Sequence, residues 1–415
     1  MKLAARLALA TAVSAVFAGS AFAENIKIAF IDPLSGPFAA TGVNGVKQFE
    51  HAIDVLVNDQ GGVLGGRELE LVPFDNKISA QESLVQLQVA IDQGIRFIAQ
   101  GNSSGVANAL TDAINKHNRR NPEDRVLFLN YSAVDPALTN DKCNFWHFRF
   151  DAHAGIKMDA LTDVMAENED LSKVYIIGQD YSFGKAVAAA AVSNLETKRP
   201  DVEIVGNELH PIGKVKDFTP YARKIVASEA DAVITGNWGS DMIGLGKAIL
   251  ESGFDGPIYT YYAAADGITA TFGEAGKGSL RLVAEGQLNP PPSPEAQAIY
   301  ESFKARHPEP EANISQARVY NTIKMLSMAI EEAGTADDVV AVADALSGME
   351  TEGVWGGMLK MREQDHQLIQ NVHIMAHTDE NITFDYDGSG FGVYAAETVE
   401  MASADIETTC KMRRP

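Results

Sequence analysis

The chain has 415 residues, 46% of them hydrophobic and 22% charged. This is an ordinary globular composition, which excludes a disordered or fibrous protein, and the length predicts two or three domains. Lysine and arginine number 34 against 56 aspartates and glutamates, a formal net charge of −22. Such an acidic chain is not expected to bind nucleic acid or an anionic bilayer, because neutralising phosphates requires clustered cations.

The first 23 residues predict a signal peptide that is cut after Ala23. Lys2 and Arg6 form a positive start, residues 7–17 are apolar, and Ala21-Phe22-Ala23 is a small-x-small cleavage site. The apolar run is shorter than the roughly 20 residues that span a bilayer. Cleavage removes two bases and no acid, which leaves 32 bases against 56 acids and a net charge of −24. We therefore expect a periplasmic protein that begins at Glu24.

The chain has two cysteines, Cys143 and Cys410. In an oxidising compartment an even number of cysteines favours a disulfide, and two free thiols are the alternative.

Strand and helix patterns alternate through the first part of the chain. Strands are predicted over 26–31, 68–72, 96–100 and 126–129, and helices over 43–58, 80–93 and 106–116. The strands are mainly apolar, with strict alternation of polar and apolar residues in 68–72, and all are too short to be helices. This order predicts a parallel sheet with helices on both faces.

The alternation restarts after Arg149. Helices are predicted over 156–165, 183–198 and 219–227, and strands over 173–177, 202–209, 232–235 and 257–260. Prolines 290, 291, 292 and 294 predict an extended junction. Helices over 294–306, 315–332 and 336–346 follow, and then a hairpin of 357–361 with 368–375. The fold class is α/β, with two doubly wound parallel-sheet lobes.

Residues Gly101-Asn-Ser-Ser-Gly105 lie between a predicted strand and a predicted helix. They match G-x-S-x-G, the nucleophile elbow of α/β-hydrolases, with Ser103 as the nucleophile. The same geometry without a nucleophile is an anion site, because the N-terminus of a helix has free N–H groups. A secreted serine hydrolase is thus the alternative to a binding protein.

Other chemical motifs are missing from the sequence. There is no G-x-G-x-x-G after the first strand and no Walker A sequence, and the histidines lack zinc spacing. We therefore expect no cofactor, no metal and no catalytic residue. His373 and His377 are expected to be surface residues.

Aromatic residues follow the ends of several predicted strands: Tyr131, Tyr181, Phe183, Trp238, Tyr261 and Tyr262. In open parallel sheets, ligands bind outside the carboxyl ends of the strands. These positions therefore predict an aromatic ligand site.

The sequence resembles the type I periplasmic solute-binding proteins of ABC importers, in the Leu/Ile/Val-binding protein branch that takes branched-chain amino acids and amides. The resemblance covers essentially the whole mature chain. The segments that carry it are Ile28-Ala-Phe-Ile-Asp-Pro-Leu-Ser-Gly-Pro37, Gly61-Gly-Val-Leu-Gly-Gly66, Gly101-Asn-Ser-Ser-Gly105, Asp135-Pro-Ala-Leu-Thr139, Asp180-Tyr-Ser-Phe-Gly184 and Lys216-Asp-Phe-Thr219.

This resemblance implies a Venus-flytrap: two lobes joined by a multi-strand hinge that close on a ligand. Lobe 1 is expected to comprise 24–148 and 287–353, and lobe 2 to comprise 149–286 and 354–398. Crossings are expected near 148–150, 285–288 and Gly353. The tail, 399–415, is expected to be tied to the hinge region by Cys143 and Cys410.

The resemblance also implies contacts with the ligand. Ser103 and the neighbouring amides, including that of Ser104, would take a carboxylate. The other expected contacts are Tyr131, Ser132, Ala133, Val134, Tyr181, Phe183, Trp238 and Tyr262. The expected function is to capture a small hydrophobic or aromatic carboxylate and to deliver it, as a monomer, to the permease subunits.

The chain departs from the family at two positions. Ala263 stands where an acidic residue pairs with the ligand ammonium, and Thr41 stands near the place of a common tyrosine. A buried ammonium without a carboxylate is costly, so an aliphatic amino acid would need Asp241 or Asp266 as a substitute. The aromatic residues would suit an aromatic or hydrophobic acid, because stacked rings contribute about 0.5–1.5 kcal/mol beyond burial.

Overall fold

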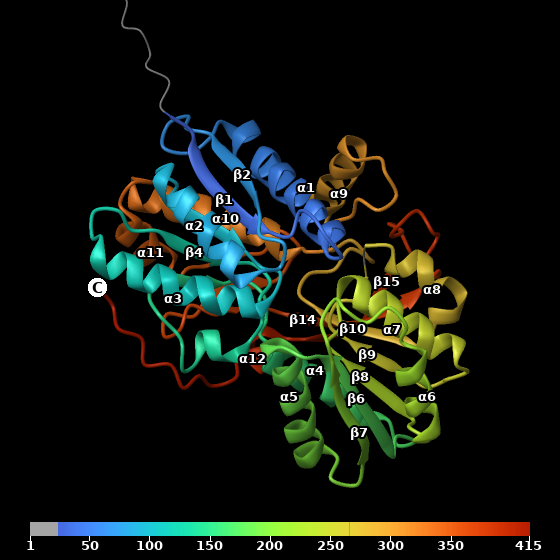
Figure 1. Cartoon of the computed structure of the whole chain (residues 1–415). Helices are drawn as coiled ribbons and strands as arrows, with labels where there is room; N and C mark the ends of the chain where they lie inside the picture. The colour runs from blue at the N-terminus through green and yellow to red at the C-terminus, as the bar shows by residue number, and fades with distance from the viewer. Residues whose placement is uncertain (1–23, 265) are drawn as a thin grey trace, which may run out of the picture.

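The computed structural model describes residues 24–264 and 266–415, so the expected signal peptide lies outside the described residues. The described chain forms two lobes, one at the upper left of Figure 1 and one at the lower right. Each lobe is built on a wholly or mainly parallel sheet with helices on both faces, which confirms the predicted fold class.

The sheet of lobe 1 has five parallel strands in the order β2-β1-β3-β4-β5. The strands are β1 (Ile26–Asp32), β2 (Leu69–Asp75), β3 (Phe97–Gln100), β4 (Leu127–Asn130) and β5 (His147–Arg149). Helices α2 (Ala80–Asp92) and α3 (Ser104–Arg120) lie side by side over one face. The other face is covered by α1 (Ala39–Leu56) and α10 (Arg318–Ala333), with α9 (Pro294–Arg306) and α11 (Val339–Leu346) packed beside them.

The sheet of lobe 2 has seven strands in the order β15-β14-β10-β9-β8-β6-β7. The parallel strands are β6 (Lys173–Gln179), β7 (Glu203–His210), β8 (Ala232–Thr235), β9 (Ile258–Thr260) and β10 (Leu280–Ala284). Strands β14 (Val372–Thr378) and β15 (Gly392–Val399) complete the sheet in antiparallel pairing. Its helices are α4 (Ala154–Glu167), α5 (Ser182–Lys198), α6 (Thr219–Ala227), α7 (Gly239–Glu251) and α8 (Ile268–Gly276).

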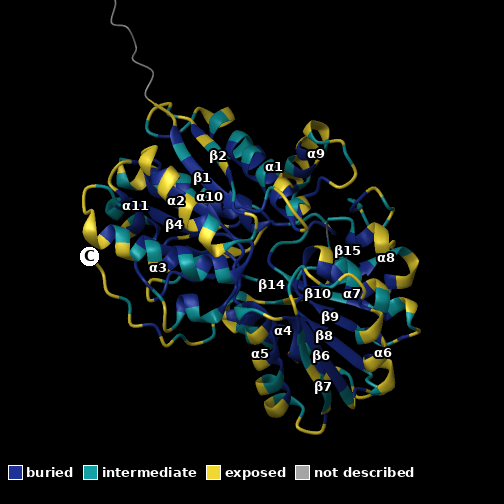
Figure 2. Cartoon of the chain, in the orientation of Figure 1, coloured by how far each residue is buried: buried dark blue, intermediate teal, exposed yellow. Residues whose placement is uncertain are grey.

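Burial explains why these segments form strands and helices. Residues 28–31 of β1 are fully buried because helices cover both faces of the sheet, and the buried strands form the dark centre of each lobe in Figure 2. Side chains that accept a backbone N–H bond fix several helix starts. Ser79 caps α2 in this way, and Ser293, followed by Pro294, caps α9.

After Gly353 the chain is divided between the two lobes at a different place from the expected boundary. The expected hairpin strand 368–375 is two strands, β13 (Leu368–Ile369) and β14. Strand β13 belongs to a small antiparallel sheet with β11 (Glu350–Glu352) and β12 (Met358–Met361), whereas β14 pairs with β10 in lobe 2. Residues 354–368 therefore lie with lobe 1, because Leu359, Met361 and Leu368 are buried in its core, whereas Ile369 is buried in the core of lobe 2.

The third crossing between the lobes consequently lies at residues 369–371 and not near Gly353. It runs beside the first crossing, which follows β5. Gln367 Nε2 donates to the carbonyl of Asp151 at 2.8 Å, and Gln370 Nε2 donates to the carbonyl of Phe150 at 2.8 Å. The second crossing follows β10. The hinge is therefore a set of extended segments held together by buried amides.

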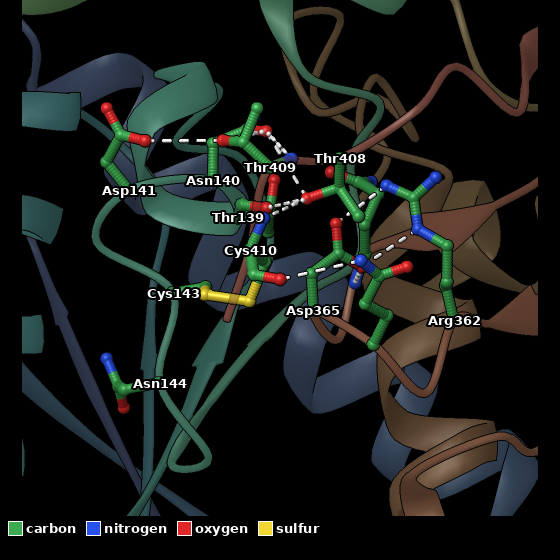
Figure 3. Close-up of a disulfide and its surroundings, with 12 residues drawn as sticks. Thr139, Asn140, Asp141, Cys143, Asn144, Arg362, Asp365, Thr408, Thr409 and Cys410 are labelled. Atoms are coloured by element: carbon green, nitrogen blue, oxygen red, sulfur yellow. Dashed lines mark hydrogen bonds and ion pairs between the residues drawn. A yellow bond between two sulfur atoms is a disulfide. The ribbon is translucent and has the colours of Figure 1, made fainter. Parts of the chain in front are cut away.

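The predicted disulfide between Cys143 and Cys410 is present, with Cα atoms 5.8 Å apart. Figure 3 shows that the tail around Cys410 also bonds to the loop before Cys143. Thr408 Oγ1 donates to the carbonyl of Thr139 at 2.7 Å, and Thr409 N donates to Asn140 Oδ1 at 2.9 Å. The tail thus leaves β15 in lobe 2 and ends against lobe 1.

Candidate functional site

The lobes face each other across a cavity with about 680 Å³ of empty space, part of it continuous with solvent. Strand-end loops of both sheets line it, together with the segment before α10. The lining residues are Thr41, Gly101, Asn102, Ser103, Ser104, Ser132, Ala133, Val134, Tyr181, Phe183, Trp238, Gly239, Tyr261, Tyr262, Ala264, Asp266, Leu282, Ala284, Ser315, Gln316 and Arg318.

The structure brings nine of the ten expected ligand contacts to this cavity: Ser103, Ser104, Ser132, Ala133, Val134, Tyr181, Phe183, Trp238 and Tyr262. Tyr131 is the exception, because its side chain is fully buried beneath the site. Its hydroxyl donates to Asp32 Oδ2 at 2.6 Å and accepts a bond from Asn102 Nδ2 at 3.0 Å. Tyr131 therefore supports the loop that carries Ser103.

Ser103 lies at the start of α3, on a loop that Asp32 holds from below. The carboxylate of Asp32 accepts bonds from Gly101 N at 3.1 Å and Asn102 N at 3.0 Å. Burial without a cationic partner raises the pKa of Asp32 to about 7. Ser103 itself has φ +83°, a left-handed conformation that is rare for a residue with a side chain.

Close packing explains the glycine of this loop. A Cβ atom on Gly101 would lie 2.6 Å from Ser132 Cβ, so only glycine lets the loop approach the end of β4. The loop brings the N-terminus of α3 and the Ser103 hydroxyl to the cavity, beside the hydroxyl of Ser132, which follows β4. Free N–H groups and hydroxyls beside a positive helix end can hold an oxyanion.

Ser103 lacks the partner that a nucleophile needs. In the part of the chain that the structure describes, no histidine is hydrogen-bonded to Ser103. The two histidines that we expected at the surface are buried, because β14 is an inner strand between β10 and β15. His373 Nδ1 is 2.9 Å from Thr398 Oγ1, and His377 Nε2 is 2.8 Å from the carbonyl of Gly273. Both are therefore structural residues.

A buried cluster of four charged residues lies at the hinge, and one of them, Arg318, also lines the cavity. Lys157 Nζ is 2.6 Å from Asp151 Oδ1 and 3.2 Å from Glu285 Oε2, and Arg318 Nη1 is 2.6 Å from Glu285 Oε1. Asp151 follows the first crossing strand and Glu285 follows the second, whereas Lys157 and Arg318 come from α4 and α10. Burial raises the pKa of Asp151. The cluster ties both lobes to the hinge.

Arg318 connects this cluster to the cavity. Its Nη2 donates to Ser132 Oγ at 2.7 Å, and the guanidinium lies 5.6 Å from the ring centre of Tyr262. The Tyr262 hydroxyl in turn donates to Asp151 Oδ2 at 3.1 Å. Sequence reasoning missed Arg318, because nothing in the pattern of α10 distinguishes it from a surface arginine.

Aromatic rings from lobe 2 form a wall of the cavity. Phe183 packs against Tyr261, Tyr262 and Tyr181, with ring centres 5.5, 5.9 and 5.9 Å away. Trp238 Nε1 donates to the Tyr181 hydroxyl at 2.8 Å, which fixes both rings. Such a wall can bind an apolar or aromatic group, and the Trp238–Tyr181 bond gives the polar atoms of these two residues a hydrogen-bond partner within the wall.

Asp266 is an acidic residue in the cavity lining. Its Oδ2 accepts a bond from Thr41 Oγ1 of lobe 1 at 2.6 Å. Burial, as the largest cause, raises the pKa of Asp266 to about 6. Within residues 24–264 and 266–415, no lysine, arginine or histidine forms an ion pair with it.

The other acidic candidate is differently placed. The side chain of Asp241 is buried at the start of α7, where Oδ2 accepts bonds from Gln179 Nε2 and Gly213 N, both at 2.8 Å. Ala263 is fully buried in the core of lobe 2. Of the two substitutes considered for a missing acid at Ala263, Asp266 is the one that lines the cavity.

None of the described helices is long and apolar enough to cross a bilayer. The described residues also contain no group of three or more histidine, cysteine, aspartate or glutamate side chains placed to hold a metal ion.

Comparisons with known proteins agree with this geometry. Residues 25–381 match the model of a family described as periplasmic binding protein. "Leu/Ile/Val-binding protein homolog 4" of Brucella abortus is 29% identical over 97% of this chain and 96% of its own.

Solved structures give the same result. A leucine-, isoleucine-, valine-, threonine- and alanine-binding protein from Brucella ovis, in a closed conformation, is 27% identical, with a TM-score of 0.84 over 95% of this chain and all of that one. A Rhodopseudomonas palustris ABC transporter solute-binding protein in complex with p-hydroxybenzoic acid is 20% identical, with a TM-score of 0.77 over 91% of this chain and 97% of that one.

Proposed function

Because the chain belongs to the periplasmic binding protein family, we propose that its cleft captures a small solute with a carboxylate and a hydrophobic or aromatic body, and delivers it to the permease of an ABC importer. The observation that carries this proposal is the distribution of groups in the cavity. The N-terminus of α3 and the hydroxyls of Ser103 and Ser132 line the same cavity as the aromatic wall around Phe183.

Asp266 narrows the ligand class. A half-buried carboxylate with one hydroxyl donor and a raised pKa is stabilised by a cation, and an ammonium group would supply one. We therefore propose an α-amino acid with an apolar or aromatic side chain. Its carboxylate would bind at Ser103 and Ser132, and its ammonium would bind at Asp266. The curated relative named for leucine, isoleucine and valine supports this class.

An aromatic acid without an ammonium group is the second candidate. The aromatic wall favours it, and p-hydroxybenzoic acid is the ligand named for the Rhodopseudomonas palustris protein of the same fold. Such a ligand would leave Asp266 without a partner, and Asp266 would then have to bind it in the protonated form.

Capture needs no chemical change in the ligand. A ligand that touches both lobes stabilises the closed state only by its extra affinity for that state. We propose that the protein acts in the periplasm as a monomer, after cleavage behind Ala23. Its acidic surface would offer carboxylates to a permease partner.

Matched pairs of compounds test the ligand class. Calorimetric titration with L-phenylalanine and 3-phenylpropanoate, and with L-leucine and 4-methylpentanoate, varies only the ammonium group within each pair. We expect the amino acid to bind at least about 100-fold more tightly in one or both pairs, as a buried charge pair requires. Tight binding of 4-hydroxybenzoate, with no binding of either amino acid, would overturn the amino-acid assignment in favour of the second candidate.

Ser103→Ala separates capture from hydrolysis, which the G-x-S-x-G match and the left-handed φ of Ser103 would otherwise suggest. A binding protein loses part of its affinity when one hydroxyl is removed. A hydrolase loses turnover of an ester such as p-nitrophenyl acetate by orders of magnitude. We expect weaker binding of the amino acid and the same slow background release of p-nitrophenol in both proteins.

A further inference from the structure

Phe38 directly precedes α1 of lobe 1, but its side chain packs in the hydrophobic core of lobe 2. It is 4% exposed, and its ring centre lies 4.3 Å from that of Trp238, with the ring planes tilted by 36°. Trp238 lines the ligand cavity, whereas Phe38 does not. The two rings therefore form an apolar contact between the lobes next to the cavity.

Two glycines of lobe 2 make room for the Phe38 ring. A Cβ atom built on Gly213 would lie 2.9 Å from this ring, and one on Gly239 would lie 2.8 Å from it. Both distances are shorter than a side chain tolerates, and both glycines have positive φ. Gly213, Trp238 and Gly239 thus form a socket, and the carboxylate of Asp241 holds it by accepting the Gly213 N–H bond at 2.8 Å.

The segment of lobe 1 that carries Phe38 is firmly held. A Cβ atom on Gly42 would lie 1.8 Å from the carbonyl oxygen of Pro33, so the first turn of α1 packs directly on the end of β1. In the same turn Thr41 bonds to Asp266 of lobe 2. The start of α1 therefore presents two contacts to lobe 2, an apolar one through Phe38 and a polar one through Thr41.

We propose that Phe38 is a closure latch: a positioning residue that enters the glycine socket when the lobes close, packs against Trp238 and slows ligand release. Opening the lobes exposes the ring to water, so the hydrophobic effect favours closure. Because Phe38 is absent from the cavity lining, it stabilises the closed state by the same factor for every ligand. This inference rests on the proposed function only in requiring that the cleft opens and closes.

Phe38→Ala and Phe38→Leu test the latch, with Val43→Ala on the exposed face of the same helix as the matched control. Dissociation rates and affinities are measured by stopped-flow fluorescence and calorimetry with L-leucine and L-phenylalanine. We expect Phe38→Ala to raise the dissociation rate constant and the Kd about 10- to 100-fold for each ligand, the factor that corresponds to burying one phenylalanine. Phe38→Leu should change the dissociation rate constant and the Kd much less than Phe38→Ala does, because leucine keeps most of the apolar contact. Val43→Ala should match the wild type.

A ligand-free measurement separates this inference from the proposed function. Fluorine NMR of protein labelled with 5-fluorotryptophan, with saturation transfer to detect minor states, reports whether Trp238 exchanges between an environment packed on Phe38 and an open one. We expect Phe38→Ala to abolish the packed environment of Trp238 in the ligand-free protein. If this occurs and neither amino acid binds, the ligand assignment fails and the latch stands.

Three outcomes would overturn the latch. One is a Phe38→Ala change below threefold in the dissociation rate, and another is a loss for one ligand but not for the other. The third concerns the unfolding midpoints of the ligand-free variants. If Phe38→Ala and Phe38→Leu lower the midpoint equally relative to Val43→Ala, Phe38 has a merely structural role.

Discussion

Arg318 Nη2 donates a hydrogen bond to Ser132 Oγ over 2.7 Å, at the boundary between the buried charge cluster and the ligand cavity. Arginine can only donate, so the Ser132 hydroxyl must accept this bond and keeps its own proton for another acceptor. The bond thus orients the hydroxyl as a donor toward the cavity. A carboxylate is the acceptor that such a donor suits best.

Ser132→Ala is therefore expected to weaken the binding of any carboxylate ligand. A hydrogen bond to a charged group contributes about 1.5–3 kcal/mol, so the Kd should rise roughly 10- to 100-fold. Calorimetric titration measures this change, with Ser193→Ala on the exposed side of α5 as a control that should bind as the wild type does. An unchanged Kd in Ser132→Ala would show that the carboxylate binds elsewhere.

Asp266→Asn should remove selectivity for the ammonium group. We expect the affinity for L-leucine or L-phenylalanine to fall about 100-fold, because the ligand charge would be buried without a counter-ion. The affinity for 3-phenylpropanoate should stay within a few-fold. Thr41→Val is the matched control, since it removes the bond to Asp266 Oδ2 and keeps the carboxylate. Equal losses for amino acid and desamino acid would refute the role of Asp266.

Binding of an amino acid should depend on pH through Asp266, whose pKa of about 6 lies well above its ordinary value of 3.8. A bound ammonium group favours the ionised form, so the association constant should rise with pH, by at most tenfold per unit, and level off above about pH 6. Titrations between pH 4.5 and 7.5 check this slope, and Asp266→Asn should flatten it.

The same group has the opposite effect on the folding of the ligand-free protein. In the unfolded protein the Asp266 carboxyl loses its proton near pH 3.8, whereas in the folded protein it keeps the proton up to about pH 6. The contribution of Asp266 to the free energy of unfolding therefore falls as the pH rises from about 4 to 6. Denaturant unfolding of wild type and Asp266→Asn at these pH values should show the difference. A larger contribution at pH 6 than at pH 4 would contradict the raised pKa.

Glu285→Gln should destabilise the folded protein by about 3–5 kcal/mol, because it leaves the buried charges of Lys157 and Arg318 short of one partner. Chemical denaturation measures the change. Glu350→Gln breaks an exposed ion pair with Lys360 and should leave the unfolding midpoint unchanged. Equal midpoints for the two variants would mean that the hinge cluster adds no stability.

The periodic parts of the fold could be predicted from the sequence because local signals and burial agree there. Helix α6 (Thr219–Ala227), strand β8 (Ala232–Thr235) and helix α9 (Pro294–Arg306) have the predicted bounds. The run 368–375 was predicted as one strand, because the apolar residues on either side of Gln370 and Asn371 fit a single strand as well as two short strands in different sheets.

The cavity was predictable to the extent that it uses strand ends. Ser103, Ser132, Phe183 and Trp238 all follow strands, and the topology places these ends together. Arg318 could not be found in this way, because it lies on a helix of the returning segment. Its partners, Asp151 and Glu285, come from separate crossings, and only the folded hinge brings them together.

The link between Cys143 and Cys410 has a consequence for proteolysis. Cys143 precedes the first passage of the chain into lobe 2, and Cys410 follows the last return, so all of lobe 2 is contained in one covalent ring. A protease that cuts a single exposed loop within this ring cannot release a fragment. The nicked protein should migrate as one species on a denaturing gel until a reductant is added, and only then separate into two.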